Sequence, residues 1–245
     1  MKTQNKKSLL ILLSIIIGVF LIILISAANN PVGPDTLNIT SNTTKSTAGA
    51  TMVNISGGYV ASINITATVQ DTRWKAFVGR VSGAFSLQDS TGSTVYNWAL
   101  TSITGRIYAT RNSTTVSWAN VNCSNITTLN QENINMNHSN ANDNLNMTFN
   151  YSTGATHKSF YVGSRLMVNN TCPTLNTFKN NASQDTNFEE MALYDGYNVF
   201  YATILDPSQI GYNAQTYDFQ MIVPENGAAS FQGATAYYLY VELGT

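Results

Sequence analysis

The sequence predicts an all-β fold, an antiparallel β-sandwich of Greek-key or jelly-roll type that follows an N-terminal apolar helix. Three observations support this prediction. A long apolar segment is confined to the start of the chain, apolar and polar residues alternate with period two in much of the rest, and turn residues separate the alternating segments. The chain therefore divides into an apolar segment at residues 1–28, a linker at 29–52 and a β-sandwich domain at 53–245.

The apolar segment has the composition of a signal peptide or of an N-terminal membrane anchor. Lys2, Lys6 and Lys7 precede an uncharged run over residues 8–28. About 18 apolar residues can cross a bilayer as a helix, whereas a signal peptide has a shorter apolar core that ends in small residues. The length favours an anchor and the small residues at 26–28 favour cleavage, so both readings stay open. In both cases the lysines remain in the cytoplasm, and the rest of the chain is expected outside the cell or on its surface.

Residues 29–52 are expected to form an extended linker. They contain Pro31 and Pro34 and are rich in Ser, Thr and Asn, a composition that does not support a packed core. The linker would hold the β domain away from the membrane.

Alternation is clearest at 59–69, where the odd positions are apolar or aromatic and most even positions are polar. Segment 145–151 shows the same pattern. Further strands are predicted at 77–87, 94–100, 106–110, 160–168, 198–205, 217–223 and 236–243. A helix is predicted at 186–194, because Thr186 and Glu189 have the spacing of a capping box. The Asn-rich residues 120–144 are expected to form a long irregular surface loop.

Twelve of the thirty asparagines open an Asn-x-Ser/Thr sequon. Serine and threonine make up 52 of 245 residues, so chance alone predicts about six sequons (30 × 52/245). The twelve predicted glycosylation sites are Asn38, Asn42, Asn54, Asn64, Asn112, Asn122, Asn125, Asn137, Asn146, Asn150, Asn169 and Asn181. In an exported chain, several of them are expected to carry glycans.

The two cysteines and the charge balance restrict the chemistry. Cys123 and Cys172 both fall in the exported part, where a pair is expected to form a disulfide. Their spacing does not suggest a metal site. After residue 28 the chain has nine Lys/Arg (12 − 3) against thirteen Asp/Glu, a net charge of about −4 that does not favour nucleic-acid binding.

No set of residues predicts catalysis, so we expect a protein that is not an enzyme and has no cofactor. His138 and His157 lack a nucleophile or a carboxylate at a recognisable spacing. The acidic residues Glu189, Glu190 and Asp195 are expected to be a solvated first helical turn rather than a catalytic pair. The Asn-rich segment 140–144 offers oxygen ligands but a single carboxylate, which favours a solvated loop over a calcium site.

Aromatic residues could form a platform on which a sugar ring stacks. Trp74, Trp98 and Trp118 are predicted to lie in the core, where large strand residues are favoured. For Tyr238 and Tyr240 the sequence leaves exposure and burial equally open.

Three segments resemble a pattern in uncharacterised archaeal secreted or cell-surface glycoproteins. They are RWKAFVGRVSGAFSLQDSTGSTVYNW at 73–98, IYATRNSTTVSWANVNCSN at 107–125, and the closing segments YDFQMIVP and AYYLYVEL. The resemblance covers most of the exported part. It implies a location in the cell envelope and no known chemistry.

These features predict an exported, N-glycosylated envelope protein with a structural or adhesive role. Its expected partners are the membrane, if the apolar segment is uncleaved, and either a further copy of itself or a glycan. One alternative is a pilin-like filament subunit, in which Lys6-Lys7-Ser8 would be the cleavage site, although the usual small residue before it is missing. The other alternative is a carbohydrate-binding module.

Overall fold

The computed structural model describes residues 30–98, 100, 102–114, 116–139, 141–150, 155–184 and 186–244. The predicted apolar helix at residues 1–28, and with it the choice between signal peptide and anchor, lies outside this part of the chain. Among the described residues, no helix combines the length and the apolar character needed to cross a membrane.

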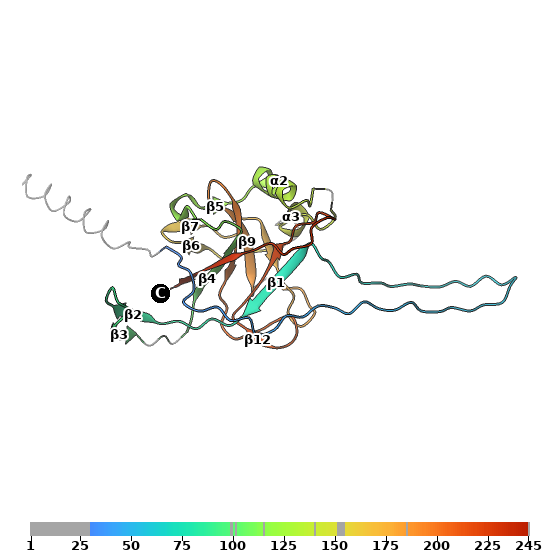
Figure 1. Ribbon diagram of the computed structural model, residues 1–245, viewed down its shortest axis with the longest axis horizontal. Coiled ribbons are helices and arrows are strands. Elements are labelled where there is room, and N and C mark those ends of the chain that lie inside the picture. Colours follow the sequence, from blue (N-terminus) through green and yellow to red (C-terminus); the bar gives the residue numbers. More distant parts are fainter. Residues whose placement is uncertain are drawn as a thin grey trace, which may run out of the picture.

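The described elements are mostly short strands (Figure 1). In chain order they are β1 (Trp74–Gly79), β2 (Phe85–Gln88), β3 (Thr94–Trp98), β4 (Gly105–Thr110), the 3₁₀ turn η1 (Trp118–Asn120), β5 (Asn122–Cys123), α2 (Ile126–Asn135), α3 (Leu145–Thr148), β6 (Phe160–Val162), β7 (Arg165–Met167), β8 (Thr174–Asn176), β9 (Glu189–Tyr194), β10 (Val199–Ile204), β11 (Gln209–Ile210), β12 (Thr216–Tyr217), β13 (Phe219–Pro224) and β14 (Tyr238–Leu243). All the strand pairs are antiparallel. The predicted all-β class is therefore confirmed, while the Greek-key or jelly-roll sandwich stays a prediction.

A six-stranded sheet forms the centre of the body. Its order is β14-β4-β10-β9-β5, and β8 also pairs with β9. On one face, residues such as Ile107 and Tyr201 pack against Met221 of β13 and against α2 and α3. On the other face, Tyr108 and Phe200 pack against Trp118 and the β6–β7 hairpin. The central sheet is thus buried on both faces.

Burial on both faces explains why the predicted helix at 186–194 is wrong. Most of this segment forms β9, in which five of six residues are buried. A strand covered on both faces has no polar side and so does not alternate. The spacing of Thr186 and Glu189 imitates a capping box, but the strand pairs that β9 makes with β10, β5 and β8 override that local signal.

The predicted loop at 120–144 is also wrong, since it contains α2. The side chain of Asn125 accepts a hydrogen bond from the Thr128 amide, and the Thr128 hydroxyl accepts one from the Asn125 amide, so the helix begins with a reciprocal cap. The strand predicted at 145–151 is wrong, because α3 occupies the first four residues of this segment. Its cap is Asn144, and the amide of Leu145 donates to Asn133 of α2.

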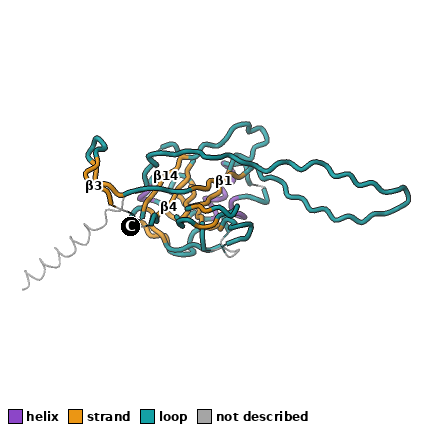
Figure 2. Tube along the Cα trace, turned by 90° about the horizontal axis from the view of Figure 1, so that it is seen from below, coloured by secondary structure: helices purple, strands orange, loops and turns teal. Residues whose placement is uncertain are grey.

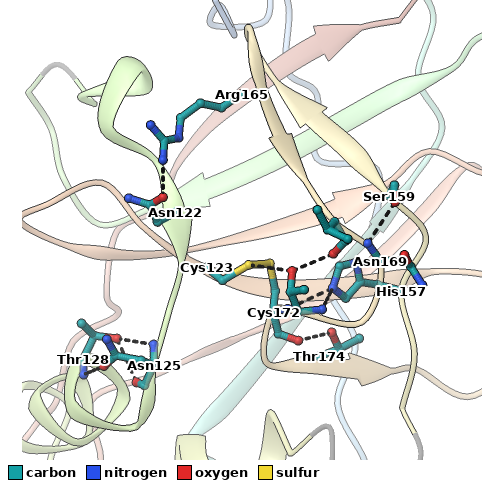
Figure 3. Close-up of a disulfide and its surroundings, with 12 residues drawn as sticks. Asn122, Cys123, Asn125, Thr128, His157, Ser159, Arg165, Asn169, Cys172 and Thr174 are labelled. Carbon is teal, nitrogen blue, oxygen red and sulfur yellow. Dashed lines mark hydrogen bonds between the residues drawn. A yellow bond between two sulfur atoms is a disulfide. The ribbon is translucent and has the colours of Figure 1, made fainter.

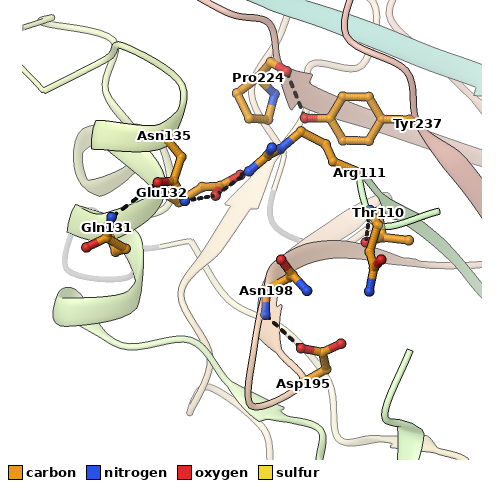
Figure 4. Close-up of polar contacts among 10 residues, drawn as sticks. Thr110, Arg111, Gln131, Glu132, Asn135, Asp195, Asn198, Pro224 and Tyr237 are labelled. Atoms are coloured by element: carbon orange, nitrogen blue, oxygen red, sulfur yellow. Dashed lines mark hydrogen bonds and ion pairs between the residues drawn. The ribbon is translucent and has the colours of Figure 1, made fainter. Parts of the chain in front are cut away.

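An ion pair attaches α2 to the central sheet (Figure 4). Arg111, directly after β4, reaches both carboxylate oxygens of Glu132 at 2.6 Å. Glu132 is 2% exposed, and its carboxylate also accepts from Asn135. A buried carboxylate of this kind needs its cation, because an unpaired charge in the interior is costly.

Five predicted strands correspond to described ones, namely β3, β4, β10, β13 and β14. The predicted strand at 160–168 is instead the β6–β7 hairpin, because Gly163 turns the chain with a positive φ of 55°. The predicted strand at 77–87 spans parts of β1 and β2, which belong to different sheets.

The predicted strand at 59–69 belongs to a segment that leaves the body, which we call the arm (residues 43–72). Figures 1 and 2 show the arm as two long extended legs that project beyond the rest of the molecule. Every residue of the arm is exposed, and none is in a strand. The prediction of a strand is wrong for this isolated chain because a strand requires a partner, and the described chain provides none.

The β2–β3 hairpin also projects from the body (Figures 1 and 2). Leu87, Val95, Tyr96 and Trp98 are all at least half exposed. Trp98 is therefore not a core residue, contrary to the prediction. Trp118 is buried and Trp74 is partly buried, as expected for those two.

Candidate interaction surface

Both histidines are buried, and their rings are hydrogen-bonded to backbone groups. His157 is buried, and its Nε2 accepts hydrogen bonds from the amides of Thr171 and Cys172 at 3.0 Å each. Its Nδ1 therefore carries the proton and donates to the carbonyl of Lys158 at 2.8 Å. Burial lowers the pKa of His157, and in this neutral form the ring joins two loop segments. His138, also buried, lies 2.7 Å from the carbonyl of Glu225 through its Nε2.

The three acidic residues are buried, not solvated as predicted. Glu189 accepts from the amide of Lys158, and Glu190 accepts from the amide of Ile222 at 2.8 Å. Since neighbours in a strand point to opposite faces, Glu189 and Glu190 cannot form a catalytic pair. Asp195 closes the turn before β10 by accepting from the amides of residues 197 and 198.

Glu190 gives the stability of the protein a specific pH dependence. It is fully buried, and burial raises its pKa well above the ordinary value of 4.5. The folded protein therefore keeps this proton at pH values where the unfolded chain has lost it. The contribution to stability is complete below pH 4.5 and falls as the pH rises toward the folded-state pKa.

We expect Glu190→Gln to remove this dependence while keeping the acceptor for Ile222. The unfolding free energy of the wild type should lose up to about 1.4 kcal/mol per pH unit from this group in that window, and the variant should not. Glu225→Gln is the control, because Glu225 should make the stability rise with pH, which is the opposite of the effect of Glu190. Burial alone would raise the pKa of Glu225, but hydrogen bonds from Lys75 and Thr235 lower it. Urea unfolding at several pH values measures both effects, and parallel profiles for wild type and Glu190→Gln would contradict the assignment.

The disulfide between Cys123 and Cys172 is present, as predicted (Figure 3). Cys123 lies on β5, and Cys172 precedes β8. Both strands pair with the same edge of β9, so the disulfide connects two strands that follow each other along that edge. Cys172 is fully buried, whereas Cys123 is partly buried.

The segment at 140–144 shows no sign of a calcium site in its described residues. Asp143 pairs with Arg73 at 2.9 Å, and its carbonyl accepts from the indole of Trp74. Asn144 caps α3. In the described ranges, no three His, Cys, Asp or Glu side chains gather where a metal ion could be held.

The aromatic candidates do not form one platform. The ring of Tyr240 packs against Trp118, with 5.2 Å between centroids, so this tyrosine contributes to the core. Tyr238 is 43% exposed. Tyr96 and Trp98 form a separate exposed pair on the β2–β3 hairpin, 5.1 Å apart.

None of the twelve sequon asparagines is buried. Nine are exposed, and three are partly buried, namely Asn112, Asn146 and Asn150. Asn146 lies in α3 and Asn150 follows it, so neither is on the outer face of a strand. The amide nitrogen of Asn146 is hydrogen-bonded to Asn130. By contrast, Asn54 and Asn64 lie on the exposed arm.

The outer edge of β14 is mostly unpaired. The backbone groups of Val241 bond Val32, on the side of β14 away from β4. Since successive residues of a strand direct their backbone groups to opposite sides, those that face β4 belong to Tyr238, Tyr240 and Glu242. Leu239 and Leu243 therefore also face outward, and no backbone partner of theirs is found among the described residues. Val32 is the one residue of the described chain that pairs with this edge.

The outer edge of β1 is unpaired as well. The Arg73 carbonyl accepts from the amide of Glu225, so the odd-numbered residues of β1 face β13. Trp74, Ala76 and Val78 then direct their backbone groups outward, where the described chain provides no strand. The opposite edge of β13 is bonded by side chains: the Ile222 amide donates to the Glu190 carboxylate, and the Gln220 carbonyl accepts from the Thr203 hydroxyl.

The two open edges lie side by side. The ammonium of Lys75 donates to the carbonyl of Thr235, and the rings of Phe77 and Tyr237 are 6.4 Å apart. A Cβ at Gly83 would lie 2.5 Å from Leu243. Each of these three contacts joins residues that are 160 positions apart in the sequence. A constant separation means that the two segments run in the same direction, so β1 and β14 are parallel, although no hydrogen-bond ladder joins them.

Partly buried apolar side chains accompany these open edges. They are Trp74, Phe77, Val81, Tyr237, Leu239, Val241 and Leu243, all of which pack against the core. We call β1, β14 and these side chains the open-edge surface. The sequence could not reveal it, because whether an edge is free depends on which strands pair. Next to it, where the arm returns to the body, a cavity of about 660 Å³ lies between residues 69–73 and 225–233.

Neither the family models, nor the curated proteins, nor the solved structures contain a match to this chain.

Proposed function

We propose that this chain is an exported, N-glycosylated protein of the cell envelope with a structural or adhesive role, and that its function depends on contacts between surfaces rather than on catalysis. The arm is the observation on which this proposal rests. It exposes a row of large apolar residues, including Ile63 and Ile65, on a segment that projects from the body. Exposed apolar rows of this kind are typical of interaction sites.

Two further features support export. The disulfide is compatible with an oxidising compartment. The sequons are spread over exposed and partly exposed positions, as an extracellular glycoprotein requires. The resemblance to archaeal surface glycoproteins agrees with this proposal.

A filament subunit is the second candidate, and the combination of the arm with two open edges favours it. Carbohydrate binding has less support, because Tyr240 is part of the core and only Tyr238 of that pair is substantially exposed. The β-sandwich that the sequence predicts is part of the proposal: the β1–β13 pair would be one layer of it, and the central sheet the other.

Mass spectrometry of the mature protein from its native host tests export and glycosylation together. A chain that starts near Asn29 indicates a cleaved signal, one that starts at Met1 indicates an anchor, and one that starts near Leu9 indicates a pilin. We expect glycans at the accessible sequons Asn54 and Asn64, with much lower occupancy at Asn146, whose amide nitrogen is hydrogen-bonded. Unmodified peptides at both arm sites, together with recovery of the protein in the cytosolic fraction, would contradict the proposal.

A further inference from the structure

Building on the proposed structural role, we infer that the arm of one copy enters the open-edge surface of a second copy as a β-strand, with residues 59–69 lying between β1 and β14. The arm is then a donor, the open-edge surface is its acceptor, and copies join head to tail. Addition of a strand to a free sheet edge is a common mode of protein recognition.

The arm has the properties of a strand that lacks a partner. Its odd positions from 59 to 69 are apolar or aromatic, and large side chains among them are strongly exposed, with Ile65 at 80% and Val69 at 86%. Its backbone makes few bonds: the Tyr59 amide donates to Ser56 at the tip, and the Thr68 carbonyl accepts from Lys45. Pairing with a sheet edge would bury the apolar row and satisfy the backbone at once.

The acceptor offers open backbone groups on both sides, and the inserted strand would replace Val32 at the one position, Val241, where the edge of β14 is already bonded. Ala76 and Val78 face it from β1, and Leu239 and Leu243 face it from β14. The neighbouring side chains of Phe77 and Tyr237 meet on the core side and would form the floor. Because β1 and β14 are parallel, an inserted strand can pair with both in the same sense. Val32 pairs antiparallel with Val241, which shows that the edge of β14 accepts that direction.

The root of the arm directs it away from its own acceptor. Arg73 donates its amide to Asp71 and its guanidinium to Asp143, and the indole of Trp74 donates to the Asp143 carbonyl. In Figure 1 the arm leaves the start of β1 and runs away from the body. Folding back onto the same copy would require a sharp turn within residues 70–73, where these bonds are made. A second copy meets the arm without breaking them.

The predicted glycan site agrees with this arrangement. Asn64 lies on the polar side of the alternating segment, opposite Ile63 and Ile65. When the apolar row faces the floor, the side chain of Asn64 faces solvent, because successive residues of a strand point to opposite faces. A glycan there is compatible with insertion.

The test uses the full chain in detergent and measures association by sedimentation velocity over a range of concentrations. The wild type should form oligomers that grow with concentration. The double variant Ile63→Asp/Ile65→Asp should weaken association at least about a hundredfold, because each substitution places a charge where the complex would bury an isoleucine. The matched control, Ser62→Asp/Thr68→Asp, adds the same charge to the polar face of the same segment and should associate like the wild type.

A mixing experiment tests the head-to-tail geometry. Ala76→Pro removes an outward amide of β1 while leaving the residues that bond β13 unchanged, so it blocks the acceptor and keeps the donor. Ile63→Asp/Ile65→Asp blocks the donor and keeps the acceptor. Each variant alone should stay monomeric, and an equimolar mixture should form dimers and nothing larger.

Three results would overturn the inference: a wild type that stays monomeric, equal weakening by the control pair, or a mixture that does not dimerise. Protection of residues 59–69 from hydrogen exchange that does not depend on concentration would show that the arm folds onto its own copy. If the mature protein is exported and glycosylated but remains monomeric, the inference fails while the proposed envelope role stands.

Discussion

Cys123→Ser is expected to lower the free energy of unfolding by about 4 kcal/mol, a large share of the roughly 5–15 kcal/mol that a domain usually has. The disulfide closes a loop between residues 49 positions apart, which restricts the unfolded chain. It also fixes the Cys172 segment, whose amide donates to the buried ring of His157. Both strands at this edge of β9 should therefore loosen when the bond is lost.

Urea unfolding without reductant measures this effect. The double variant Cys123→Ser/Cys172→Ser is the control, and it should be little less stable than either single variant, since one bond is lost in each case. Wild-type protein unfolded with reductant should approach the same value. A loss below about 1 kcal/mol in the single variant would contradict the view that the disulfide restricts the unfolded chain substantially.

Removal of Arg111 is expected to have the second largest effect. Arg111→Ala leaves the Glu132 carboxylate buried without its cation, and this should cost about 3 kcal/mol, the lower end of the usual range because Arg111 is partly exposed. The consequence should be concentrated in α2, which the ion pair joins to the end of β4. Hydrogen exchange of residues 126–135 should accelerate more than that of β9 or β10.

A double variant separates the ion pair from simple loss of packing. Arg111→Met/Glu132→Leu removes both charges and keeps apolar volume, so it should be more stable than Arg111→Ala. Arg80→Ala is the matched control for an exposed arginine, which bonds Thr216 at the surface, and it should change stability by less than about 0.5 kcal/mol. Equal losses in Arg80→Ala and Arg111→Ala would contradict the role assigned to Glu132.

The strands that alternation predicts well are those with unequal faces or clear turn boundaries. At β14, Leu239, Val241 and Leu243 face the core, and Tyr238 lies on the opposite, partly exposed face. β9 lacks such a contrast, since both of its faces are covered, and its sequence therefore predicts a helix instead. The cap of α2 is visible in the sequence, but as Asn125 and Thr128 rather than the more familiar Ser or Thr with Glu.

The sequence by itself determined the all-β class, the disulfide partners and five of the described strands, because these depend on local patterns or on there being only two cysteines. It also identified 59–69 as a segment with the character of a strand. Only the tertiary structure decided that this segment has no partner within the described chain, and that β1 and β14 keep open edges beside each other. The physical reason is that a strand is completed by hydrogen bonds to another strand, and the identity of that strand follows from how distant segments assemble.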